Sequence, residues 1–157
     1  MARRRGDHDA AEAHLRTCLG WLRDVGGRSG VAFVLAQLGF VAEARGDAGR
    51  ALALHREGFE AAAATGDPRA VALALEGLAG ARALAGERAR AARLLGTADA
   101  ARASAGAPLP PAERVDVDRI TARARDALGG AAFAAAFARG RDCGPEAWSS
   151  LDMDRPD

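Results

Sequence analysis

The feature that most constrains this chain is a short motif that recurs at a fixed interval. Gly46 is followed at once by an acidic residue and, five positions after the glycine, by an alanine. The same arrangement stands 40 residues earlier at Gly6 and 40 residues later at Gly86. A repeat of this length is typical of a supersecondary unit that stacks on copies of itself. The interval therefore predicts an array of similar units.

Within this interval the apolar residues recur at helical spacings, and Gly, Asp and Pro mark the borders. We expect helices at residues 7–25, 29–44, 48–64, 68–85, 87–104 and 111–128, followed by a short helix that ends near residue 140. Asp7, Asp47 and Asp67 are placed to cap helices, and Pro68 suits a first helical position. The fold class predicted is all-α.

The first expected helix carries an apolar stripe that we expect to be buried. Its members are Ala11, Leu15, Cys18, Leu22 and Val25, with Trp21 half-buried beside them. The helix expected at 29–44 is apolar on two sides, which predicts packing on two sides.

The repeated units resemble tetratricopeptide repeats. The matching residues are Leu35, Leu38-Gly39, Gly46-Asp47 and Ala51 in one unit, and Leu75, Leu78-Ala79, Gly86-Glu87 and Ala91 in the next. The resemblance implies tetratricopeptide-like helical hairpins (an α-solenoid) over residues 1–105, with an incomplete first unit. We expect the helices within 106–141 to cap the exposed end of the stack and residues 142–157 to form a mobile tail, although Trp148 could dock as a lone anchor.

The C-terminal half resembles the end of large actinobacterial transcriptional regulators of the LuxR type, which carry an ATP-binding module. The similarity rests on Ala92-Arg93-Leu94-Leu95-Gly96, on Gly106 to Arg114, and on Leu128-Gly129 with Phe133 to Arg141. Phe137 departs from it, because that family commonly has Trp there. The resemblance implies a sensory or interaction arm. No nucleotide-binding residue transfers, because the chain has no phosphate-binding loop of the GxxxxGK[ST] type and no lysine.

Charge and cysteine usage exclude several classes of protein. The 22 basic residues are all arginine and are balanced by 21 acidic residues, which argues against direct nucleic-acid binding. Cys18 and Cys143 do not form a disulfide framework. No secretory signal follows Met1, and the longest apolar run is too short to span a membrane. We therefore expect a cytoplasmic protein with no membrane partner.

A groove is the candidate binding site, because the first helix of each tetratricopeptide unit lines the concave surface. The corresponding residues are Phe33, Ala36, Gln37, Phe40, Leu73, Glu76, Gly77 and Gly80. Phe33 and Phe40 are seven residues apart and can face one groove, where a helix or an extended peptide would dock. The alternative is that these residues pack against a neighbouring unit or against the C-terminal helices.

Candidates for catalysis are weak. His14 and Cys18 are four residues apart on one expected helix, but two residues do not make a metal site or an activated nucleophile. We expect His55 to be packed or half-exposed, and Glu57 and Glu60 to be solvated. No catalytic residue, metal site or cofactor is therefore predicted.

The function predicted is a non-catalytic module that binds a protein, a peptide or a small-molecule effector. The alternatives are a small-molecule-binding or cofactor-free catalytic helical protein of specialised metabolism, and a remnant fragment without an independent role. Because the expected first helix lacks a partner helix on one side, we also expect self-association through it.

Overall fold

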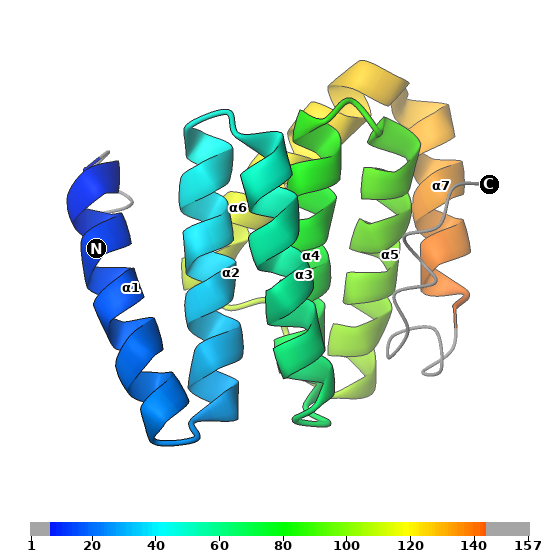
Figure 1. Cartoon of the computed structure of the whole chain (residues 1–157). Helices are drawn as coiled ribbons and strands as arrows, with labels where there is room; N and C mark the ends of the chain where they lie inside the picture. Colours follow the sequence, from blue (N-terminus) through cyan, green and yellow to red (C-terminus); the bar gives the residue numbers. More distant parts are fainter. Residues whose placement is uncertain (1–6, 144–157) are drawn as a thin grey trace.

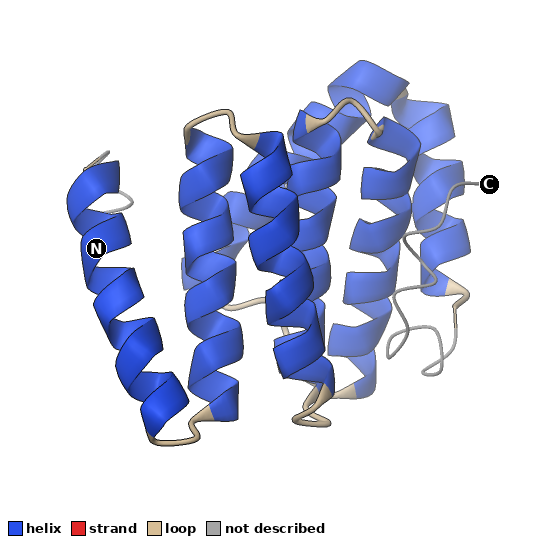
Figure 2. Cartoon of the chain, in the orientation of Figure 1, coloured by secondary structure: helices blue, strands red, loops and turns tan. Residues whose placement is uncertain are grey.

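The computed structural model describes residues 7–143, and this part of the chain is a helical protein without strands (Figures 1 and 2). The expected all-α class is thereby confirmed. Its seven helices are α1 (His8–Asp24), α2 (Arg28–Ala44), α3 (Ala48–Ala63), α4 (Pro68–Leu84), α5 (Arg88–Ser104), α6 (Pro111–Leu128) and α7 (Gly130–Arg141). None of them combines the length and apolarity that a membrane-crossing helix needs. Trp148 and most of the expected C-terminal tail lie outside the described residues.

Glycines set the length of the first five helices. Gly26, Gly46, Gly66, Gly86 and Gly106 follow one another at intervals of 20 residues, and each has a positive φ between 58° and 87°. At Gly46 the amide of Asp47 donates to the carbonyl of Ala42 over 3.0 Å, which is the Schellman ending of a helix. The turns at Gly26, Gly86 and Gly106 have the equivalent hydrogen bond. The sequence repeat is thus a repeat of helix endings.

The expected N-terminal caps are confirmed. The carboxylates of Asp7, Asp47 and Asp67 accept backbone N–H groups of the first turns of α1, α3 and α4 over 2.9–3.1 Å. Pro68 occupies the first turn of α4, where its missing N–H costs no hydrogen bond.

The helices pack in sequence order, with α4 at the centre. α2 contacts α3, α3 contacts α4, α4 contacts α5, and α2 also lies against α4. All residues from Val71 to Ala83 are buried, so α4 is covered on every side. α2 is buried over most of its circumference, as its two apolar stripes predicted. Much of this core is alanine, which allows neighbouring helices to approach closely.

The last two helices, α6 and α7, do not follow the row in sequence order. α7 lies beside α5, at the end of the row, where a cap was expected. α6 instead passes behind the row and contacts α4 and α5 (Figure 1). Its Arg119 reaches back to Glu43 of α2 over 3.1 Å. α6 therefore covers one face of the stack.

The prediction of a buried stripe on the first helix was wrong for two of its five residues, and the exposure of Trp21 beside it was also underestimated. Cys18 is exposed, Val25 is 57% exposed, and Trp21, expected to be half-buried, is 62% exposed. Ala11 and Leu19 are the apolar residues of α1 that are buried. The reason is that the extended packing contact of α1 is with α2 alone, so that one side of its apolar surface has no helix against it.

Ion pairs attach the start of α1 to the turn between α2 and α3. Glu12 is buried and pairs with Arg45 and Arg50, and also with Arg16 over 2.8 Å. Burial alone would raise the pKa of the Glu12 carboxyl, but hydrogen bonds from Arg45 and the charges of Arg50 and Arg16 outweigh it and hold the pKa below its ordinary value. Glu12 is therefore ionised in the folded protein at neutral pH.

This pairing makes the attachment of α1 sensitive to acid. A carboxyl whose pKa is lowered by folding stabilises the protein above its unfolded pKa, and that contribution is lost as the pH falls through the lower, folded value. We expect Glu12→Gln to destabilise the protein by roughly 1 kcal/mol at pH 7 and by much less at pH 3. Urea unfolding followed by circular dichroism measures both. Asp24→Asn, at an exposed position of α1, is the control, and an equal loss for Glu12→Gln at both pH values would contradict the expectation.

Candidate functional site

Five of the eight residues of the predicted groove face α6. Phe40, Leu73 and Glu76 are buried, Gln37 is partly buried, and Phe33 is 48% exposed. Together they line one side of a small hollow of about 90 Å³. Its other side is formed by Ala112, Glu113, Asp116 and Val117 of α6. This hollow is smaller than the roughly 300 Å³ at which small-molecule sites begin.

The other three groove residues are buried. Ala36 is 1% exposed. Gly77 faces the ring of His55, and Gly80 faces the carboxylate of Glu43. These glycines therefore make room for neighbouring side chains of α2 and α3.

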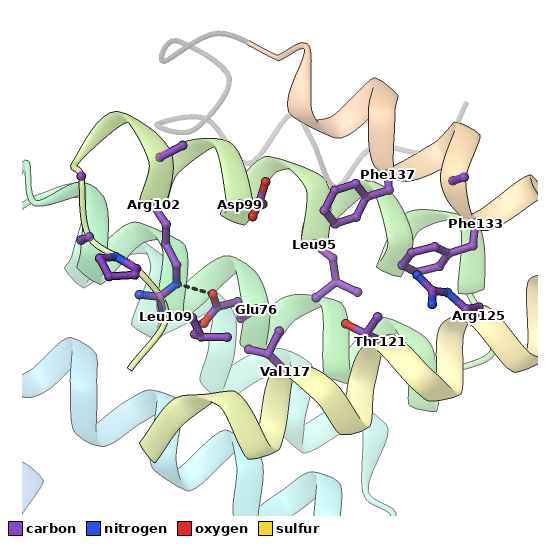
Figure 3. Close-up of a pocket in the computed structure, with 15 residues that line it drawn as sticks. Glu76, Leu95, Asp99, Arg102, Leu109, Val117, Thr121, Arg125, Phe133 and Phe137 are labelled. Atoms are coloured by element: carbon purple, nitrogen blue, oxygen red, sulfur yellow. Dashed lines mark hydrogen bonds and ion pairs between the residues drawn. The ribbon is translucent and has the colours of Figure 1, made fainter. Parts of the chain in front are cut away.

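A larger cavity lies on the other side of α6, between α4, α5 and α7. Its volume is about 680 Å³, which falls in the range of small-molecule sites. Figure 3 shows its lining, which comes from four helices and the loop after α5. The large apolar side chains are Leu95 of α5, Leu109 of the loop, Val117 of α6, and Phe133 and Phe137 of α7.

The wall formed by α7 is fixed by a close approach to α5. Gly96 of α5 faces the backbone at Phe137, and Gly140 of α7 faces the backbone at Arg93. Between them the hydroxyl of Thr97 lies 3.1 Å from the carbonyl oxygens of both Arg93 and Gly140. This contact holds Phe133 and Phe137 over the cavity, where their stacked rings are 5.8 Å apart.

A buried ion pair closes the end of the cavity next to α4. Arg102 donates to the two carboxylate oxygens of Glu76 over 2.6 and 2.8 Å, and to Glu113 of α6 over 2.6 Å. Burial would lower the pKa of Arg102, but its hydrogen bonds with Glu76 and Glu113 outweigh this and raise it. Burial also raises the pKa of Glu76, which Arg102 offsets only in part. Arg102 is thus a fixed charge that joins α4, α5 and α6.

The opposite end of the cavity carries Arg125 and Thr121, one turn apart on α6 (Figure 3). The guanidinium carbon of Arg125 lies 5.0 Å from the centre of the Phe133 ring, in cation–π geometry. Asp99 of α5 also lines the cavity, and its carboxylate pairs with Arg141 over 3.2 Å. The cavity is therefore mostly apolar, with a few polar groups in its lining.

His55 belongs to a second buried polar cluster. Its side chain is fully buried, and Nε2 lies 2.9 Å from Oε1 of Glu43, whose side chain is also fully buried. Phe40 packs edge-on against the His55 ring, with 5.0 Å between the ring centres. Neither hollow is lined by His55 or Glu43. The pair therefore connects α2, α3 and, through Arg119, α6, without forming part of either candidate site.

The remaining sequence candidates do not converge. His14 and Cys18 are both exposed on α1, as are Glu57 and Glu60 on α3. Over residues 7–143, no three His, Cys, Asp or Glu side chains are placed to hold a metal ion. Exposed Trp21 and Val25 leave an apolar surface on α1. Self-association through this surface stays a prediction.

Sequence reasoning located Glu76 but missed the cavity beside it. Leu95, Phe133 and Phe137 were named only in the motifs of the family resemblance, and Asp99, Thr121 and Arg125 were not singled out. The available signal was the glycine- and proline-rich break at 106–111, since such loops often border sites. Comparison with protein-family models, with curated proteins and with solved structures gave no match.

Proposed function

We propose that this chain is a non-catalytic, tetratricopeptide-like helical module that binds a small, largely apolar effector in the cavity between α4 and α7. Helix endings recur every 20 residues, and α2 packs against α3 as α4 packs against α5. Both observations support the α-solenoid interpretation. A sensory arm of the regulator type suggested by the sequence resemblance would have this organisation.

The observation that carries the proposal is the cavity itself. Its volume of about 680 Å³ can hold an organic ligand, whereas the hollow under the predicted groove, at about 90 Å³, cannot. Its walls are mainly apolar side chains, which favour the burial of an apolar ligand body, and its few polar groups would orient the ligand. We therefore favour a small effector over a peptide.

The test is a titration with N-phenylnaphthylamine, a neutral aromatic dye that becomes fluorescent in apolar sites. Ala134 lines the cavity from α7 and is exposed to it, so Ala134→Trp should fill part of the volume. We expect the dissociation constant to rise at least tenfold, because most of the apolar contact area is lost.

Ala135→Trp is the matched control, because Ala135 is the next residue of α7, is exposed and does not line the cavity. It should bind the dye like the original protein. Ala103→Trp fills the cavity from α5 and serves as a second variant, and circular dichroism checks that all three fold. Undiminished dye binding by both filled variants would contradict the proposal.

A further inference from the structure

The acidic residues that line the cavity are already paired with arginines. Each carboxylate that lines it already has an arginine, because Glu76 accepts two hydrogen bonds from Arg102 and Asp99 pairs with Arg141. Arg102 is engaged in turn by Glu76 and Glu113. A cationic ligand group would therefore have to displace an existing arginine.

Arg125 is the exception among the lining residues. Its guanidinium rests on the Phe133 ring and has no carboxylate partner within residues 7–143. An arginine stacked on an aromatic ring keeps its N–H groups free at the edge of the guanidinium plane. Thr121, one turn earlier on α6, adds a hydroxyl to the same end of the cavity (Figure 3).

We propose that the cavity selects amphipathic organic anions, whose apolar body lies between Leu95, Val117 and Phe137 and whose single anionic group binds Arg125 and Thr121. This inference rests on the proposed function and adds the ligand class. Charge complementarity supports it, because an anion would supply the partner that Arg125 lacks among residues 7–143. A carboxylate or sulfonate can accept two N–H groups of one guanidinium, which would also fix the orientation of the ligand.

Two dyes with the same aromatic body separate the anion preference from apolar binding. N-phenylnaphthylamine is neutral, and anilinonaphthalene sulfonate is the same molecule with one sulfonate group. In Arg125→Gln we expect the dissociation constant of the sulfonate to rise roughly threefold to tenfold, as for a charge-assisted hydrogen bond at a partly open site. The dissociation constant of the neutral dye should change less than twofold, because the apolar walls remain.

Arg123→Gln is the matched control. Arg123 is exposed on α6, two residues from Arg125, and does not line the cavity, so this variant removes the same charge elsewhere on the helix. It should leave both dissociation constants within twofold. Arg125→Lys should retain part of the preference for the sulfonate, since the positive charge remains.

The outcomes distinguish the two proposals. If Ala134→Trp and Ala103→Trp weaken the neutral dye but Arg125→Gln leaves the sulfonate unaffected, the anion preference is wrong and the apolar site stands. An equal loss of both dyes in Arg125→Gln would also overturn the preference, because Arg125 would then only support Phe133. If neither dye responds to the filled variants, the proposed function itself is wrong.

Discussion

Gly96→Ala is expected to destabilise the protein by about 3 kcal/mol and to displace α7 from α5. A methyl group at this position would overlap the carbonyl oxygen of Phe137, and it would lie 2.9 Å from the carbonyl carbon and 3.1 Å from the amide nitrogen of Arg141. These are backbone atoms of a packed helix, so no side-chain rotation relieves the overlap. Urea unfolding gives the free energy, and hydrogen exchange of the α7 amides shows whether that helix moves away.

Gly130→Ala is the control for this substitution. Gly130 stands at the start of α7 with no heavy atom near its added methyl group, so alanine there should cost nothing or stabilise slightly. Because α7 forms a wall of the cavity, Gly96→Ala should also weaken N-phenylnaphthylamine binding. A Gly96→Ala protein as stable as the original would show that α5 and α7 do not approach as closely as described.

Glu43→Ala is expected to cost about 3 kcal/mol, the second large effect. The substitution removes the partner of His55 Nε2 and one partner of Arg119. His55 Nδ1 already has no hydrogen-bond partner among the described residues, so both ring nitrogens would then be buried without one. A buried polar group without a partner loses its hydration and gains nothing in return.

Two further variants make the Glu43 result interpretable. Glu60→Ala removes an exposed carboxylate of α3 and should change the free energy of unfolding by less than about 0.5 kcal/mol. Glu43→Gln keeps a hydrogen-bonding group and should cost less than Glu43→Ala. Equal values for Glu43→Ala and Glu60→Ala would mean that the His55 cluster does not hold α6 in place.

The helices could be predicted because the residues at each helix end determine where the helix begins and ends. Glycine at the end of each helix from α1 to α6, and aspartate at three helix starts, fix these boundaries. The expected helices between residues 7 and 128 agree with α1 to α6 within one residue at each end. A helix cap depends only on residues within one turn, so that capping residues can be recognised directly in the sequence.

The buried face of α1 could not be predicted in the same way. An apolar stripe shows which side of a helix is able to pack, but not whether another helix lies against it. Cys18 and Val25 fit the stripe and are exposed, because the main packing of α1 is with α2 alone. The acidic residue Glu12 is buried instead, because arginines from two neighbouring segments reach it.

The site was missed for a related reason. The cavity depends on where α6 and α7 pack, and the contacts that place them join residues distant in sequence. Glu43 and Arg119 are 76 positions apart, and Thr97 and Gly140 are 43 positions apart. A pattern of neighbouring residues in the sequence cannot predict a contact between residues so far apart. The groove residues were expected to bind a partner, and in the structure five of them share a hollow of about 90 Å³ with α6 while the other three are buried.

A crystal structure of the protein with bound anilinonaphthalene sulfonate would test the central claim most directly. We predict the aromatic rings between Leu95, Val117 and Phe137, with the sulfonate within hydrogen-bonding distance of Arg125. A dye bound on the exposed surface of α1, or under α6 beside Phe33, with the cavity between α4 and α7 left empty, would contradict the assignment of the site.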